Sequence, residues 1–443
     1  MKKFVSKRFV PVFLLLSFLI LSGVAAAAAQ ENTKGEVKLS NLVKEATENN
    51  PQIAAARDRW QSAANIIDAR KAFPDPQLNY TYFIESVETR VGPQKNIVGL
   101  KQTFPFYGKR GLRGEIAGKE AEALEQEYKA MEREIVSAVK KQFYDFFYLW
   151  KAIQIAEDEK ELLKHFEQIA ITKYETGVGI QQNILKVQVE ISKLNDRLLE
   201  LRKQKQTAEA LINTLLNRPV HSPLGKPVQP EFRKFFFDEW DLINLATENR
   251  QDLKAAQYLV EKNKKAYALA KKDYFPDITL GANYIQVDKR PIDVNDNGQD
   301  AVNVTLSINL PIWFNKYSSQ VDSAFEMVKA QEKKHESILN QTLFEVKDYL
   351  FKLKTARDSY DLYKNALLPQ AEQSMKSAEA GYVTGIVSFL DLLDAERILL
   401  MSYFGYWRGY TDYLKYIADL ERTVGVELGE APVREYWPEM KEE

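Results

Sequence analysis

Two acidic residues near the carboxyl-terminal end of the chain are spaced so that they can act together. Asp391 and Asp394 belong to the segment Phe389-Leu-Asp-Leu-Leu-Asp-Ala395, for which we expect a helix. Residues three positions apart project from the same face of a helix. Neighbouring carboxylates attract cations and resist simultaneous ionisation, so such a pair can bind cations in a way that depends on pH. The simpler alternative is two solvated aspartates on a helix surface, because exposed charges are the norm.

The sequence lacks the motifs of the common enzyme and cofactor classes. It has no Cys and three widely separated His, which excludes thiol catalysis and argues against a zinc site. It contains no Walker loop, H-E-x-x-H, G-x-S-x-G or dinucleotide fingerprint. The segment Asp293-Val-Asn-Asp-Asn-Gly298 resembles the start of an EF-hand loop, but position 12 is Val304, so a polar turn is the better interpretation. We therefore expect no enzyme activity, no cofactor and no metal.

The overall charge balance argues against nucleic-acid binding, and the first residues of the chain indicate export. The chain has 61 Lys and Arg against 62 Asp and Glu, whereas a nucleic-acid binder normally has a basic excess. Residues 1–29 have a basic start, an apolar core and a small-residue end at Ala25–Ala29, which is the order of a secretory signal peptide. A retained anchor is the alternative. No other run approaches the roughly 18 apolar residues of a membrane-spanning helix.

The chain contains one unit twice. Four segments of the first half recur in the same order in the second half: Leu42–Asn49 as Leu242–Asn249, Phe73–Asp75 as Phe275–Asp277, Phe104–Tyr107 as Leu310–Trp313, and Tyr174–Gly177 as Tyr382–Gly385. Four matches in register are not a coincidence. The sequence therefore predicts a first structural repeat over 30–217, a Pro-rich connector over 218–238, a second repeat over 239–425 and a tail over 426–443.

Each repeat alternates long helices with short strands. We expect a helix over 40–72, and two very long helices over 111–173 and 318–381. Paired strands are predicted over 77–84 with 96–104 in the first repeat, and over 278–287 with 301–310 in the second. In the last of these, Val, Leu and Ile alternate with Asn, Thr and Ser. Turns at 174–180 and 382–388 separate each long helix from the helix that follows. The fold class is mainly α with a small β portion.

Four amphipathic strands with aromatic residues at their ends have the composition of a transmembrane barrel. Four strands cannot close, and unpaired backbone groups in a lipid bilayer cost several kcal/mol each. The chain must therefore oligomerise, and a symmetric trimer would supply about twelve strands, which is within the workable range. Soluble hairpins with ordinary buried aromatic residues are the alternative.

These features resemble those of the TolC-like outer membrane efflux proteins over nearly the whole mature chain. The similarity rests on the duplicated element order, the two Tyr-x-x-Gly turns and the segment Phe389–Ala395, while Phe104–Arg113 is similar to the metal-cation-exporting branch. The resemblance implies a homotrimer with a β-barrel in the outer membrane, continued by a coiled-coil helical barrel across the periplasm. It also implies docking to a periplasmic adaptor (membrane fusion) protein and an inner-membrane pump of the RND or ABC type.

The resemblance also assigns site residues. Asp391 and Asp394 match paired aspartates that line the narrow periplasmic mouth, and threefold symmetry would place six carboxylates there. In part of the family, an Asp and an Arg hold the residue matching Tyr382; here those positions are Asn183 and Val387, so we expect a closed resting state with a weaker lock. The turns would be the helix tips that meet the adaptor, through Tyr174, Thr176, Gly177, Val178, Tyr382, Thr384, Gly385 and Ile386.

The predicted function is a passive trimeric exit duct of a tripartite efflux or secretion system. It would lie in the outer membrane with a large periplasmic portion, while the energy source and the choice of cargo would belong to other chains. A periplasmic coiled-coil scaffold without a channel is the competing hypothesis. The alternation of residues over 302–310 favours the duct, because a scaffold needs no amphipathic hairpins.

Overall fold

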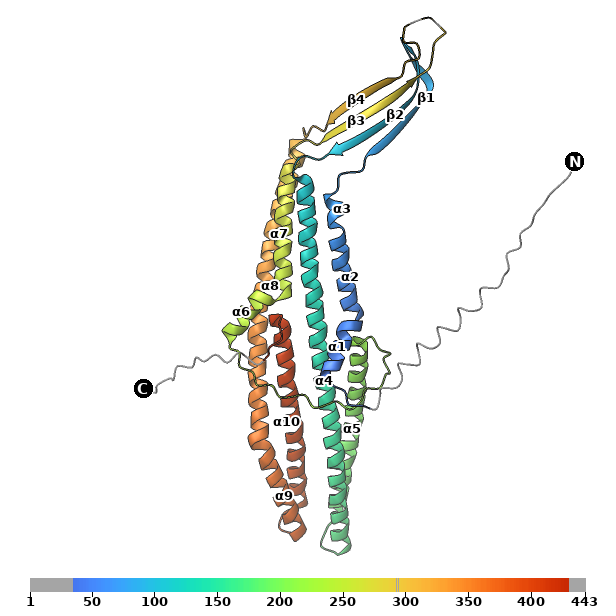
Figure 1. Ribbon diagram of the computed structural model, residues 1–443. Coiled ribbons are helices and arrows are strands. Elements are labelled where there is room, and N and C mark those ends of the chain that lie inside the picture. Colours follow the sequence, from blue (N-terminus) through green and yellow to red (C-terminus); the bar gives the residue numbers. More distant parts are fainter. Residues whose placement is uncertain (1–34, 292, 294, 430–443) are drawn as a thin grey trace, which may run out of the picture.

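The computed structural model describes residues 35–291, 293 and 295–429, and it forms a long rod with a sheet at one end (Figure 1). Helices run from the sheet to the opposite end, where two helical hairpins turn. The chain is mainly helical with one small sheet, as the sequence predicts. Among the helices of the described residues, none has an apolar stretch that could span a lipid bilayer. The predicted signal peptide over 1–29, and residues 430–443 of the predicted tail, lie outside the described residues.

The two halves of the chain share an order of elements. The first half contains α1 (Leu39–Asn49), α2 (Pro51–Asn65), α3 (Ile67–Lys71), β1 (Gln77–Thr89), β2 (Gly92–Phe104), α4 (Lys109–Glu175) and α5 (Gln181–Leu215). The second half contains α6 (Glu239–Asn249), α7 (Gln251–Lys272), β3 (Ile278–Val287), β4 (Ala301–Ile308), α8 (Phe314–Leu362), the π-helical turn η1 (Tyr363–Leu367), α9 (Leu368–Thr384) and α10 (Phe389–Val424).

The single helix predicted over 40–72 is wrong, because the structure divides this segment into α1, α2 and α3. Asn50 is extended, with φ −69° and ψ 125°, and its side-chain oxygen accepts hydrogen bonds from the backbone N–H groups of Gln52 and Ile53. Pro51 then begins α2, where a proline is well suited. The Asn50 amide also donates to the carbonyl oxygen of Leu215 at 2.8 Å, so this break fastens the end of α5.

The long helices pack through apolar stripes that follow a heptad spacing. The stripe of α5 is buried against α4 at Val187, Leu194, Leu198, Leu201, Ala208 and Ile212. Helix α4 also contacts α7 and α10, and α8 contacts α7 and α10. A buried aromatic group at Phe143, Phe146 and Phe147 strengthens the middle of α4. The result is two pairs of long helices held together along the rod.

The sheet has the order β1-β2-β3-β4, and every neighbouring pair is antiparallel. β1 continues to Thr89 and β2 begins at Gly92, so the first hairpin is longer than the sequence predicts, while β4 ends at Ile308. One face exposes apolar and aromatic side chains from all four strands: Leu78, Tyr80, Tyr82, Ile84, Val98, Leu100, Ile278, Leu280, Tyr284, Val302, Val304, Leu306 and Ile308. The other face is mostly polar, so the two faces of the sheet differ clearly in polarity.

A buried lysine joins the sheet to the helices. The Lys109 side chain is 3% exposed, and its Nζ donates to Asp277 Oδ1 and to the carbonyl oxygen of Phe275, both at 2.9 Å. Asp273 lies 3.5 Å away as a second counter-charge. The next residue, Arg110, lies over the Phe73 ring. Because a buried charge must be paired, the contacts of Lys109 hold the start of α4 to the segment between α7 and β3.

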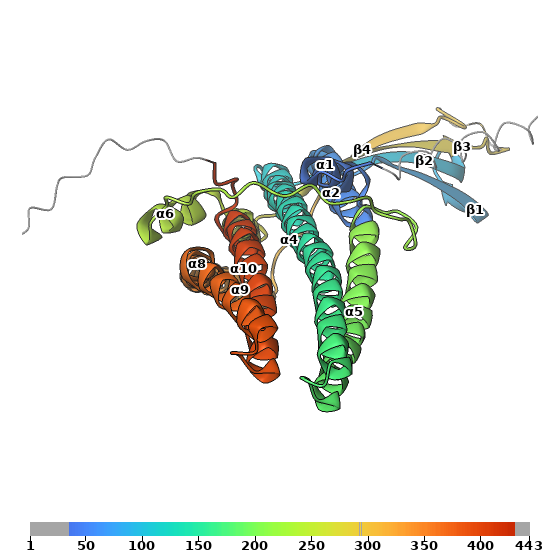
Figure 2. The ribbon, with the colours of Figure 1, turned by 90° about the horizontal axis from the view of Figure 1, so that it is seen from below.

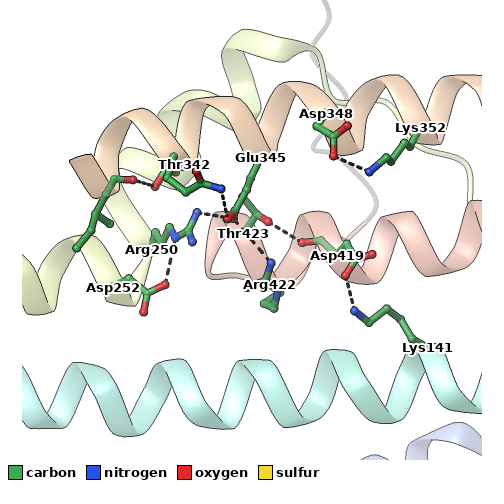
Figure 3. Close-up of polar contacts among 12 residues, drawn as sticks. Lys141, Arg250, Asp252, Thr342, Glu345, Asp348, Lys352, Asp419, Arg422 and Thr423 are labelled. Atoms are coloured by element: carbon green, nitrogen blue, oxygen red, sulfur yellow. Dashed lines mark hydrogen bonds and ion pairs between the residues drawn. The ribbon is translucent and has the colours of Figure 1, made fainter. Parts of the chain in front are cut away.

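A second charged network joins four helices near the middle of the rod (Figure 3). Arg250, which follows α6 as Asn50 follows α1, has a buried side chain and contacts Glu345 of α8 at 2.9 Å. Glu345 also lies 3.7 Å from Arg422 of α10. Nearby, Lys141 of α4 pairs with Asp419 of α10 at 2.8 Å. The network therefore holds α8 and α10 to α7 and α4 at the level where α6 turns into α7.

Candidate gate at the helix tips

Two turns with the same geometry form the end of the rod farthest from the sheet. Figure 2 shows the hairpin of α4 and α5 beside the hairpin of α9 and α10, seen from that end. Gly177 and Gly385 have φ values of +74° and +83°, in the left-handed region that favours glycine. In each turn the following N–H groups bond back to one helix carbonyl: Val178 and Gly179 to Lys173, Ile386 and Val387 to Gly381. The repeated Tyr-x-x-Gly motif thus encodes a helix C-cap.

Replacement of Gly385 by Ala should loosen the second turn. No atom lies within 4 Å of the added Cβ, so the cost is that of a left-handed backbone, about 1–2 kcal/mol. We expect the amides of Ile386 and Val387 to exchange with solvent about 5- to 30-fold faster. Gly118→Ala is the control: the site is equally open but lies within α4 without a positive φ, so it should be neutral or stabilising. Unchanged exchange in Gly385→Ala would contradict the proposed strain.

The structure separates the predicted tip residues into an exposed group and one buried tyrosine. Val178 is 75% exposed and Ile386 is 84% exposed, so each turn presents an apolar side chain to solvent. Tyr174 is 48% exposed, whereas Tyr382, at the matching position of the second repeat, is 6% exposed. Thr176 and Thr384 each bond back to carbonyls of their own helix. Tyr382 thus belongs to the contact between the two hairpins and is not part of their exposed surface.

Tyr382 is held by a set of neighbours that includes a positive charge. Its ring lies 5.2 Å from the Phe389 ring, and Lys173 Nζ of α4 lies 5.0 Å from the ring centre. Lys173 also donates to the carbonyl oxygen of Val383 at 3.2 Å. Burial raises the pKa of Tyr382, and Asn183 beside the hydroxyl lowers it in part. The hydroxyl makes no hydrogen bond among the described residues.

Lys173 therefore supplies the charged contact that the sequence alone did not reveal. The resemblance directs attention to positions 183 and 387, where this chain has Asn and Val. The lysine lies in the turn before the tip glycine of the other hairpin, and only the packing of the two hairpins brings it over Tyr382.

The aspartate pair lies on the exposed side of α10, above a groove that faces α5. Asp391 and Asp394 are both exposed, while Leu392 and Leu393 between them are buried. Ser388 Oγ caps α10 by accepting from the Asp391 N–H, and it lies 2.7 Å from Asp391 Oδ2. Asp394 lies 3.8 Å from Arg397, which is 3.4 Å from Glu190 of α5. The groove has a volume of about 610 Å³. No cluster of metal ligands occurs in the described part of the chain.

Behind the aspartates, two glutamates are buried between α4 and α10. Glu159 is 6% exposed and Glu396 is 4% exposed. Burial, and then the interaction with Glu396, raise the pKa of Glu159 to about 10. Burial raises the pKa of Glu396 as well; hydrogen bonding with Glu159 opposes this rise, Glu190 adds to it, and Arg397 opposes it. At neutral pH this pair therefore holds a proton in a contact two residues along α10 from Asp394.

The sequence contains a sign of this pair. Glu159 interrupts a buried stripe of α4 in which residues recur at alternating spacings of four and three: Ala152, Ala156, Glu159, Leu163, Phe166 and Ala170. A carboxyl in such a stripe must enter an interface, because the neighbouring positions do. Its partner, Glu396 on α10, could not be identified from that pattern.

The described chain is thus a rod of paired helices, with a two-faced sheet at one end and two exposed aspartates near the other. The family model for outer membrane efflux proteins matches residues 42–218 and 242–402, and the chain belongs to that family. Members are channels rather than enzymes. Membership therefore identifies this chain as an outer membrane efflux channel with a large periplasmic portion, and favours it over a scaffold without a channel.

Two relatives and one solved structure illustrate the range of the similarity. The cobalt-zinc-cadmium resistance protein CzcC of Cupriavidus metallidurans is 22% identical over 355 residues, covering 79% of this chain and 80% of CzcC. The outer membrane protein TolC of Vibrio cholerae is 20% identical over 435 residues and 95% of both chains. The crystal structure of VceC from Vibrio cholerae matches with a TM-score of 0.75 and 19% identity, over 88% of this chain and 96% of VceC.

Proposed function

We propose that three copies of this chain form a twelve-stranded barrel in the outer membrane, continued by a helical barrel that is closed at the tips. The four-stranded sheet carries the proposal, since it has one apolar face, one mostly polar face and two edges that no strand covers in the described chain. In lipid such edges are too costly to leave open. Three sheets joined edge to edge give every edge strand a neighbour for its backbone hydrogen bonds.

Native mass measurement of the detergent-extracted protein tests the assembly. We expect a trimer whose mobility on a gel changes on heating, recovered from the outer membrane fraction. A stably inserted single subunit would overturn the proposal.

In this assembly the tips would meet a periplasmic adaptor protein, and the adaptor would connect them to an inner-membrane pump of the RND or ABC type. The exposed apolar residues Val178 and Ile386, one at each turn, support this docking surface. Adaptor binding would separate the hairpins and widen the mouth at Asp391 and Asp394. The duct would supply no energy and hold no cofactor. The resemblance to CzcC makes divalent cations the first cargo to test, with cobalt, zinc, copper and a dye panel as challenges to a deletion strain.

Lys173 provides a test of the closed state. We propose that its contact with Tyr382 keeps the two hairpins together, so Lys173→Ala should open the resting channel. Loss of a cation–π contact costs about 0.5–1 kcal/mol per subunit, and three subunits together should raise resting conductance at least about fivefold. Planar-bilayer recording of the purified protein measures this. The control is Lys164→Ala, because Lys164 pairs with Glu161 on its own helix. Equal conductance in both variants, or high conductance of the unmodified channel, would contradict the lock.

A further inference from the structure

The contact between the two repeats within one chain is a template for the contact between two copies of the chain. Where β2 ends and β3 begins, Phe104 lies opposite Ile278. Just beyond, the Phe106 ring stacks on the Phe275 ring at 4.5 Å, and Asp277 accepts from the Phe106 N–H and from Lys109. The end of the first hairpin is thereby fastened to the start of the second.

The end of β4 and the start of β1, which are the matching segments in the repeat, have no such contact within the described chain. The end of the second hairpin exposes Leu310, Ile312 and Trp313 by 71%, 59% and 71%. At the other edge, Asp75 is exposed and forms no ion pair among the described residues, although it matches Asp277 in the repeat. Lys316 is exposed in the first turn of α8, so a basic residue at this edge could pair with the acidic Asp75 at the other. A second copy of this chain is the partner that fits both edges.

Resting on the proposed trimer, we infer the register of the strand pairing between subunits: β4 of one copy lies antiparallel to β1 of the next, with Ile308 opposite Leu78, Leu306 opposite Tyr80 and Val304 opposite Tyr82. The register follows from the repeat. Phe104 corresponds to Leu310 and Phe275–Asp277 to Phe73–Asp75, so the pair Phe104 with Ile278 becomes Leu310 with Pro76 of the neighbour.

The apolar face of the sheet provides an independent check on this register. The pairs it creates place exposed apolar side chains of β4 beside exposed apolar side chains of β1, on the face that already runs across all four strands. A slip by one residue would move every β1 side chain to the opposite face, which is disfavoured in a sheet with one lipid-facing side. A slip by two residues leaves every side chain on the same face of the sheet, so only an experiment can exclude it. The pairing would also extend β4 to residue 310, as the sequence predicts.

Disulfide trapping can measure the register without background, because the chain has no Cys. The inferred register places Thr305 of one subunit opposite Thr81 of the next, on the mostly polar face. The test variant is Thr81→Cys with Thr305→Cys, and the slipped controls are Asn79→Cys or Phe83→Cys, each with Thr305→Cys. Directly opposed Cβ atoms are close enough for a disulfide, whereas positions two residues along are about 7–8 Å away, so the test pair should cross-link at least about tenfold faster with diamide.

The outcomes separate this inference from the proposed assembly. Cross-linked trimers from the Thr81 pair support the register. A native trimer in which a slipped control cross-links instead, or in which none of the pairs does, overturns the register and leaves the trimer standing. Absence of any trimer in the unmodified protein overturns the proposed function itself. Each single-cysteine variant must remain uncross-linked for the readout to hold.

Discussion

Glu159→Gln is expected to stabilise the protein more at pH 8 than at pH 6. Burial raises the pKa of Glu159 to about 10 in the folded chain, against an ordinary value of 4.5. A raised folded pKa contributes stability that is complete below the unfolded pKa and is lost as pH rises towards the folded one. Between these values each pH unit costs about 1.4 kcal/mol per proton held, so the advantage of the variant should grow by about 3 kcal/mol over two units.

Glutamine preserves the size and hydrogen bonding of the side chain but carries no titrating proton, so it separates charge from packing. The charged groups that surround the pair are Glu190 and Arg397, with Lys193 and Arg197 of α5 around the same groove. Unfolding midpoints of the variant and the unmodified protein, measured from pH 5 to pH 9, provide the test. Glu161→Gln is the matched control on α4, because Glu161 is 70% exposed and pairs with Lys164. Parallel pH curves for all three proteins would refute the buried proton.

The position of this pair links its protonation to the contact between the two hairpins. Glu396 lies on α10, the helix that carries Asp391 and Asp394, and Glu159 lies on α4 of the other hairpin. Deprotonation would place two charges in the contact that holds these helices together, and like charges in a buried contact repel strongly. Resting conductance should therefore rise with pH, and Glu159→Gln should reduce that rise.

The sequence predicts the elements of this molecule better than their contacts. The turns could be predicted because Gly177 and Gly385 must adopt a backbone conformation that other residues avoid, and this requirement is visible in a single segment. Strand alternation is equally local. By contrast, Lys173 meets Tyr382, and Glu159 meets Glu396, only after two hairpins separated by about half the chain have packed. A periodic pattern shows which face of a helix is buried, but it does not show which helix covers it.

The break at Asn50 shows a different limit. The apolar pattern continues through the segment, so periodicity alone predicts one helix, whereas Pro51 and the capping side chain of Asn50 decide the outcome locally. In the second repeat, α6 and α7 separate at Arg250, the position that matches Asn50, although no proline follows it. There the buried ion pair with Glu345 holds the extended residue in place.

Asp391→Asn should reduce the affinity of the channel mouth for a multivalent cation by at least about tenfold. One substitution removes three of the six carboxylates of the proposed ring. Asparagine retains the capping contact with Ser388, so α10 should still begin at the same residue. The measurement is the lanthanum concentration that halves the current through the trimer in a planar bilayer. Asp394→Asn should have a smaller effect, because Arg397 lies 3.8 Å from Asp394 and offsets part of its charge.

Arg397→Ala distinguishes a charged ring from a mouth that is narrow only for steric reasons. Removal of the arginine would leave Asp394 without its cationic neighbour and Glu190 with Lys193 alone, so block by lanthanum should become stronger, the opposite of the result for the aspartate variants. A steric constriction predicts weaker or unchanged block in all three variants, because each substituted side chain is no larger than the original. Raised ionic strength should reduce the differences between the variants, since exposed charges are screened within about 10 Å at 0.1 M salt. If Arg397→Ala weakens the block, the carboxylates do not form the cation site, and the mouth acts by its width.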